Sequence, residues 1–161
     1  MSKYFEETKM ELEKENIYYT EFENNVLGVG FNREEKPRLV FKFQFDESSD
    51  DEDKENKDGE KYMHLGVVLQ EVNVKKVYSQ ALALCNTLNS QFRWVKFYID
   101  QDYEINVDVD AILTQGTAGA QSVELMFRMM SIIESAEPRI QQLLEGTSFA
   151  DRPVTDTSKL N

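Results

Sequence analysis

The sequence predicts an α+β fold in which helices pack on one antiparallel β-sheet. The first observation is the alternation of apolar and polar residues over 103–110, which is typical of a half-buried strand. The second is the same alternation over 38–45, with four large apolar side chains on one face. The third is the helical spacing of apolar residues in three other stretches. The expected order of elements is α-β-β-β-β-α-β-β-α, in a single domain over residues 1–146.

The first expected elements are a short helix and two short strands. Residues 3–15 carry a thin apolar stripe between charged residues, so this helix should dock on a sheet rather than stand alone. The stripe consists of Tyr4, Phe5, Thr8 and Leu12. Two strands within 17–32 are expected to meet at the pair Asn24-Asn25, which favours a turn.

Two longer strands, 38–45 and 62–69, are expected to pair in opposite directions. The 46–60 segment between them contains nine acids and two lysines, −7 of the net charge of −12. Such a run repels itself and cannot bury apolar surface, so we predict a mobile loop. An EF-hand calcium loop needs glycine at its sixth position, which would place Lys54 at the first, where lysine cannot bind calcium. Weak binding of divalent cations is the alternative for this segment.

A second helix is expected over 74–89, with Asn73 as its N-cap. Its apolar stripe includes Cys85, the only cysteine, which is therefore predicted to be a small core residue and not a nucleophile. A single cysteine also excludes an internal disulfide and fits a reducing cytoplasm. The only histidine, His64, lies in a predicted strand and is interpreted as structural.

A β-hairpin follows, and the apolar faces of its arms predict its register. A three-residue loop over 101–103 pairs Ile99 with Ile105 and Phe97 with Val107. A two-residue turn would instead place apolar and polar residues on the same face. We therefore expect the longer loop.

The outer face of this hairpin is a candidate contact surface. The predicted register places Lys96 opposite Asp108, an opposite-charge pair. Trp94 and Tyr98 are expected on the same face, where two aromatic residues beside charges favour contact with another chain. Packing beneath a neighbouring helix or strand, or a half-exposed position on the surface, is the alternative for this pair.

The last expected helix runs over 120–145, and Pro138 is expected to kink it or to end it near Ala136. Its apolar stripe is wider than one sheet face needs. Met126 and Met129 are accordingly candidates for an adaptable partner surface, with ordinary core packing as the alternative. Residues 147–161 are expected to form a flexible tail.

The composition argues against several functions. A net charge of −12 and a pI of about 4.6 oppose binding to nucleic-acid phosphates and to anionic membranes. Acids on the second hairpin arm share a face and could hold Mg²⁺, but a solvated strand has the same pattern and no catalytic array accompanies them. These acids are Asp100, Asp102, Glu104, Asp108 and Asp110. We therefore predict no enzyme activity, and no catalytic, cofactor-binding or metal-binding residue.

The run Ala-Leu-Cys-Asn-Thr-Leu-Asn over 83–89, followed by the strand from Trp94 to Asp100, resembles the YbjN-like family. Members of that family are described as bacterial sensory transduction regulators. In the family an Asn-x-x-Asn at the end of the central helix commonly precedes such a hairpin. The similarity is best over 74–135. It implies a fold similar to type III secretion chaperones and a structural role for Asn86 and Asn89, and it implies no catalytic residue.

Two functions follow from this resemblance. The first is a non-enzymatic cytoplasmic interaction module of YbjN type that binds another protein, in a regulatory setting. The second is a secretion-type chaperone that holds an extended segment of a client protein. A homodimer is expected from the chaperone-like fold, the Trp94 and Tyr98 face and the wide last helix. The candidate contact residues are Trp94, Lys96, Tyr98, Met126 and Met129.

Overall fold

The computed structural model describes residues 2–46 and 62–145. The predicted acidic loop, apart from Asp46, and the predicted tail over 147–161 lie outside these residues. The described chain contains six strands in one antiparallel sheet of order β1-β2-β3-β4-β6-β5. The α+β class and the expected order of elements are confirmed.

The strands of this sheet follow the predicted segments closely. They are β1 (Thr20–Phe22), β2 (Val26–Arg33), β3 (Lys36–Phe45), β4 (Tyr62–Asn73), β5 (Lys96–Ile99) and β6 (Glu104–Ile112). The turn between β1 and β2 contains Asn24 and Asn25 in the left-handed region, at φ 60° and 56°. Asparagine tolerates this conformation better than most residues, which is why the pair marks the turn.

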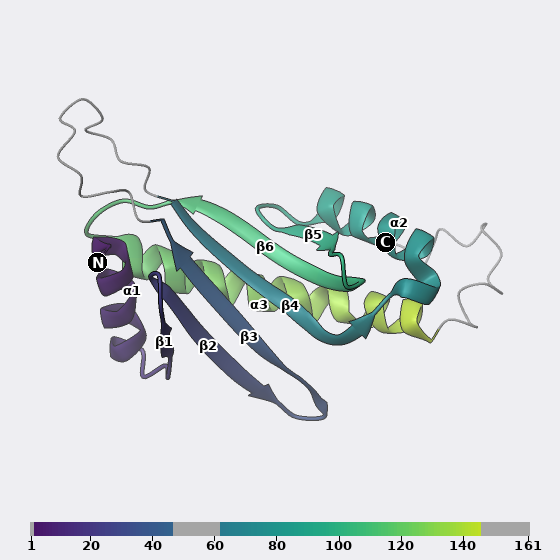
Figure 1. Cartoon of the computed structure of the whole chain (residues 1–161), viewed down its shortest axis with the longest axis horizontal. Helices are drawn as coiled ribbons and strands as arrows, with labels where there is room; N and C mark the ends of the chain where they lie inside the picture. Colours follow the sequence, from purple (N-terminus) through teal and green to yellow (C-terminus); the bar gives the residue numbers. More distant parts are fainter. Residues whose placement is uncertain (1, 47–61, 146–161) are drawn as a thin grey trace.

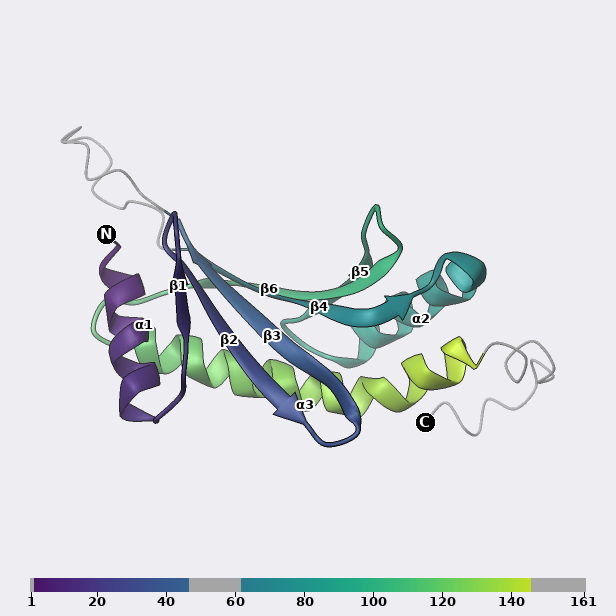
Figure 2. The ribbon, with the colours of Figure 1, turned by 60° about the horizontal axis from the view of Figure 1, so that its bottom comes forward.

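The helices are α1 (Lys3–Lys14), α2 (Tyr78–Gln91) and α3 (Ala118–Leu144), and a 3-10 turn over Lys75–Val77 precedes α2. In Figure 1, α3 runs behind the sheet and α1 lies at one end of it, while α2 lies beside β5. Figure 2 shows the opposite side of the strands free of helices. We call the side that faces α3 the inner face and the free side the outer face.

The core lies between the inner face and the helices. Alternate residues of each long strand point inward and are fully or nearly fully buried, as the period of two requires. On β3 they are Leu39, Phe41, Phe43 and Phe45, the set that the sequence predicted to share a face. Phe5 of α1 meets Phe45 edge to face, with ring centroids 6.0 Å apart. The first helix is thus part of the same core.

The N-terminal helix holds the start of α3. The Glu7 carboxylate accepts hydrogen bonds from the backbone N–H groups of Gly116 and Ala118, at 2.9 and 3.1 Å. These N–H groups have no partner within a helix, and the helix dipole favours a negative charge beside them. Thr8 Oγ1 lies 3.3 Å from Ser122 Oγ in the buried contact. Helix α1 therefore supplies capping hydrogen bonds that the side chain of Thr117, the N-cap residue of α3, does not make.

The hairpin of β5 and β6 has the predicted register. Ile99 pairs with Ile105 and Phe97 with Val107. The Asp100 N–H donates to the Glu104 carbonyl at 3.0 Å, so the loop has the predicted three residues. Tyr103 takes the left-handed position at φ 60°, which glycine usually occupies in such loops.

The Asp100 carboxylate organises this loop. It accepts hydrogen bonds from the backbone N–H groups of Glu104 and Asp102, at 3.0 and 2.9 Å, and from the Asn106 side chain at 2.6 Å. The bond from the Glu104 N–H is the largest cause of a lowered pKa for Asp100. The loop thus depends on an ionised carboxylate and not on glycine.

A pH dependence of stability follows from the lowered pKa of Asp100. Because the folded-state pKa lies below the ordinary value of 3.8, the contribution to the unfolding free energy is present above about pH 4. It is lost as pH falls through the folded-state pKa. Urea unfolding at several pH values should show that the unfolding free energy falls less steeply with decreasing pH for Asp100→Asn than for the wild type. Equal slopes for the two proteins would contradict this role of the carboxylate.

Two helix boundaries differ from the sequence prediction. The expected second helix begins as a 3-10 turn, in which the Asn73 side chain accepts the Lys75 N–H at 3.1 Å, so Asn73 caps that turn and not α2. Pro138 neither ends nor interrupts α3. Glu134, whose carbonyl loses its partner at Pro138, is exposed, and so is Pro138. Water can therefore satisfy the free carbonyl.

Candidate functional site

The outer face of the sheet is hollowed at its centre. A depression of about 440 Å³ lies over β3, β4, β6 and β5. Its lining is mixed, with aliphatic residues such as Val68 beside polar groups including Gln44 and Lys42. None of the three helices covers it (Figure 2). A depression that combines apolar walls with a few converging polar groups is the usual setting of a binding site.

A polar network crosses this depression from β5 to β4. The Tyr98 hydroxyl donates a hydrogen bond to the Asp108 carboxylate, which is only 6% exposed. His64 lies between two acids, with Nε2 3.5 Å from Asp108 and Nδ1 2.8 Å from Asp110. Burial, followed by the neighbouring Asp108, raises the pKa of Tyr98 to about 12. The phenol therefore remains protonated at neutral pH and serves as a fixed donor.

Glycines allow these side chains to lie close to the backbone. A Cβ at Gly66 would be 3.0 Å from Asp108 Oδ1 and 3.2 Å from His64 Nε2. At Gly28 it would be 2.7 Å from the Phe22 ring. Both glycines therefore make room for neighbours that lie flat across the strands. The absence of a side chain at these two glycines therefore helps to determine the shape of the outer face.

The predicted outer-face residues are only partly brought together. Lys96 does pair with Asp108 in the strand register, as predicted. Its ammonium group nevertheless lies over the Tyr98 ring, 5.2 Å from the centroid, while Asp108 contacts Tyr98 and His64. Tyr98 and Lys96 are thus on the outer face, but they form a cation–π contact in place of the expected charge pair.

Trp94 does not share the outer face with Tyr98. It precedes β5 at φ 70°, a left-handed conformation that is rare for a bulky residue. This bend carries its ring to the edge of the sheet, where it stacks with Arg128 of α3 at 5.3 Å. Trp94 remains 65% exposed. The expectation of an aromatic pair on one face is therefore replaced by two separate aromatic positions.

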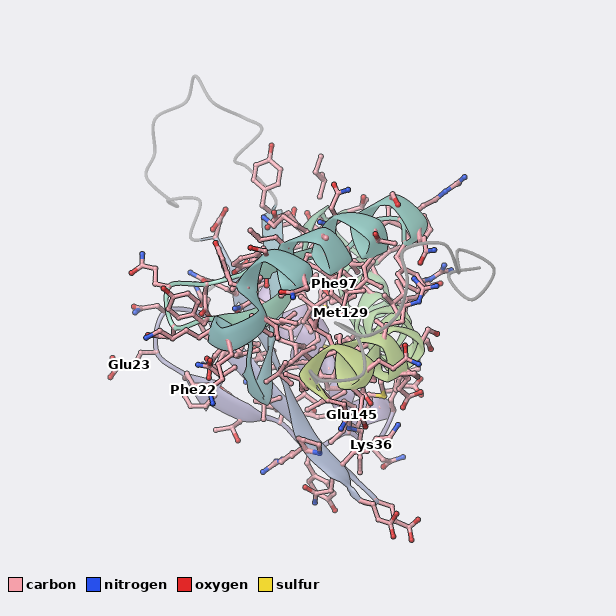
Figure 3. All side chains as sticks on the ribbon, turned by 90° about the vertical axis from the view of Figure 1, so that its right-hand side faces the viewer. Phe22, Glu23, Lys36, Phe97, Met129 and Glu145 are labelled. Carbon is pink, nitrogen blue, oxygen red and sulfur yellow. The ribbon has the colours of Figure 1, made fainter. Side chains whose placement is uncertain are left out.

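Met126 and Met129 lie in the core. Their exposed fractions are 0% and 1%, so the folded chain presents neither to a partner. Figure 3 shows Met129 in the interior of the molecule. The stripe on α3 is wide because α3 packs against the sheet and against α1, which covers a second side of its N-terminal half. Core packing, the alternative weighed from the sequence, explains both residues.

Sequence reasoning missed the role of His64. It sits between the two acids because β4 pairs with β6, which places His64 opposite Asp110. The sequence shows acids on the second hairpin arm but no histidine near them, and only the strand order joins the two. The described residues contain no group of three or more His, Cys, Asp or Glu side chains arranged to hold a metal ion.

A second hollow of about 400 Å³ lies between the β2–β3 hairpin and the last turns of α3. Arg33 and Lys36 of the hairpin form ion pairs with Glu137 beside it. Its lining is largely aliphatic and extends to Leu144, one residue before the described chain ends. The outer-face depression is the better candidate site, because described residues surround it.

The fold and its surface define an α+β protein in which one sheet face is uncovered and carries a depression of mixed polarity. The chain belongs to the YbjN family, described as "Putative bacterial sensory transduction regulator", whose match covers residues 57–144. A solved structure titled "Crystal structure of YbjN, a putative transcription regulator from E. coli" has the same fold. The two chains are 13% identical, the TM-score is 0.55, and the match covers 85% of this chain and 89% of the other. No curated protein matches the sequence.

None of the described helices, α3 included, is both long enough and apolar enough to cross a membrane.

Proposed function

We propose that the chain is a non-enzymatic, cytoplasmic interaction module of the YbjN family that binds a folded protein through the outer face of its sheet. The observation that carries this proposal is the uncovered depression with its polar network. Among the described residues, every buried side-chain nitrogen or oxygen has a hydrogen-bond partner. A surface held in this way needs little ordering when a partner binds.

The chemistry of the site favours binding over catalysis. A general acid or base works best when its pKa lies near the working pH. The pKa of Tyr98 is about 12, far above neutral pH. Asp108 is held by Tyr98 and contacts His64. These groups are suited to present a fixed pattern of donors and acceptors.

The outer face can be tested with a matched pair of charge insertions. Val68→Glu places a carboxylate in the depression at a residue that is 39% exposed, and Leu82→Glu places one on α2 at 46% exposure. We expect affinity capture from bacterial lysate, followed by mass spectrometry, to recover a folded partner with wild type and with Leu82→Glu. Recovery with Val68→Glu should fall about tenfold, the effect of burying one unpaired charge at an interface.

A photo-crosslinking residue at position 68 identifies the contact directly. It should form an adduct with the same partner, and circular dichroism should show equal folding of the two charge variants. Equal capture by wild type and Val68→Glu, or no crosslink at position 68, would place the interaction elsewhere and contradict the proposal.

A chaperone that holds an extended client segment is the second candidate function. The observation in its favour is an unpaired stretch of strand at the edge of the sheet, described below. A homodimer remains a prediction. Of the surfaces from which the sequence predicted it, the wide stripe of α3 is occupied within one chain, and Trp94 lies apart from Tyr98.

A further inference from the structure

The second half of β6 forms a free edge of the sheet. Strand β5 pairs with β6 only from Ile105 to Asp108, whereas β6 continues to Ile112 beside β4. In Figure 1 this half of β6 borders the sheet with no strand on its other side. Among the described residues, no backbone hydrogen bond reaches it from that side.

The direction of the free backbone groups follows from the hairpin. The Glu104 carbonyl accepts from Asp100, so Glu104 points its backbone groups toward β5. Alternate residues of an antiparallel strand share this direction, and the N–H and C=O groups of Asp110 and Ile112 therefore point outward at the free edge. An added strand could pair with both residues.

The outer edge of β5, by contrast, already has hydrogen-bond partners. The Asn89 side chain of α2 accepts the Phe97 N–H at 2.7 Å and donates to the Phe97 carbonyl at 3.0 Å. This amide occupies the outward groups of β5 as another strand would. Proteins commonly protect sheet edges in this way. The edge at Asp110 and Ile112 has no such cover within the described chain.

A hollow of about 320 Å³ lies beneath the free edge. It is bounded by Trp94, by Val109 and Ala111 of β6, and by Leu125, Glu124 and Arg128 of α3. The left-handed bend at Trp94 leads the chain away from β6 and leaves the indole beside this space. Every second side chain of an added strand would point toward α3 and could fill it.

We propose that this edge binds an extended basic peptide segment of a partner protein as an added strand, with one apolar side chain in the hollow beside Trp94. Unpaired backbone groups specify an extended backbone, and the hollow specifies the apolar side chain. The acids at this edge favour a basic segment: Asp110 and Glu124 are 72% and 62% exposed although His64 and Arg128 each contact one of them, and the chain as a whole carries −12. A second copy would bring the same negative charge to this edge, which opposes self-pairing.

This site would serve the second of the two proposed functions, and its test is independent of the outer face. The probe is a labelled octapeptide that alternates lysine with valine and carries one central leucine. Trp94 is the only tryptophan, so its fluorescence reports directly on the edge. We expect the peptide to shift the Trp94 emission to shorter wavelength as the ring is covered. Fluorescence anisotropy of the label gives the dissociation constant.

Two changes remove backbone pairing without altering charge. N-methylation of alternate amides of the peptide, and Ile112→Pro in the protein, each delete donors at the shared edge. Each should weaken binding about tenfold, the effect of one or two lost hydrogen bonds. Ile112→Thr keeps the N–H at the same exposed position and should bind within about threefold of wild type.

Several outcomes would overturn the proposal. They are equal binding of the N-methylated peptide, equal binding by Ile112→Pro, equal binding of a peptide with glutamate for lysine, and no binding at millimolar peptide. Sedimentation provides a further check, because a wild-type dimer that becomes a monomer in Ile112→Pro would assign this edge to a second copy. Loss of outer-face capture in Val68→Glu would leave the result at β6 unaffected.

Discussion

Gly119→Val is expected to separate α1 from α3 and to lower the unfolding free energy by about 3 kcal/mol. A Cβ at position 119 would lie 2.3 Å from the Glu7 carbonyl oxygen and 2.9 Å from its carbon. These are backbone atoms, so no side-chain rotation can relieve the contact. A displaced α1 would also withdraw the Glu7 carboxylate from Gly116 and Ala118.

The measurement is thermal and urea unfolding against a neighbouring control. A loss of 3 kcal/mol in a chain of this size lowers the melting temperature by roughly 10 °C. Ala120→Val changes an exposed residue of the same turn and should cost less than about 1 kcal/mol, chiefly through helix propensity. Amide exchange should accelerate over residues 3–14 in Gly119→Val more than over β3 and β4. Equal stability of the two variants would show that the helices can part without cost.

Asn89→Ala should lower the unfolding free energy by about 2–4 kcal/mol, since it leaves two partly buried backbone groups of Phe97 without partners. Phe97 itself is 1% exposed, so water reaches this part of β5 poorly. Asn89→Asp keeps the acceptor for the N–H but loses the donor to the carbonyl, and its effect should lie between those of wild type and Asn89→Ala.

Asn86→Ala is the matched control for this experiment. Asn86 is on the same helix, is exposed, and has no side-chain hydrogen bond within the described residues. Its replacement should change stability by no more than about 0.5 kcal/mol. A similar loss from both positions would attribute the effect to the helix and not to the Asn89 amide.

Local patterns predicted the strands and the hairpin correctly. Alternation identified β3 and β6, and the faces of the hairpin arms predicted the pairing of Ile99 with Ile105. These features depend on residues close in sequence, where the period of two leaves one register that buries all the apolar side chains. The expected structural role of Asn89 is likewise consistent with its two bonds to Phe97.

Features that depend on distant segments were predicted less well. The network at Asp108 requires that His64 of β4 lie beside β6, which the sequence does not reveal. Met126 and Met129 were predicted to be available to a partner because the packing of α1 on α3 was not anticipated. The bend at Trp94 was missed because a tryptophan rarely takes a positive φ, so alternation alone placed it on the outer face.

The contact between the first and last helices joins residues that are made early and late in synthesis. Thr8 and its partner Ser122 are separated by 114 positions. During synthesis from the N-terminus, α1 must therefore wait until most of the chain has been made before α3 can dock on it. The side of α1 that carries Thr8 stays uncovered for this period, which is when a nascent chain is most exposed to aggregation.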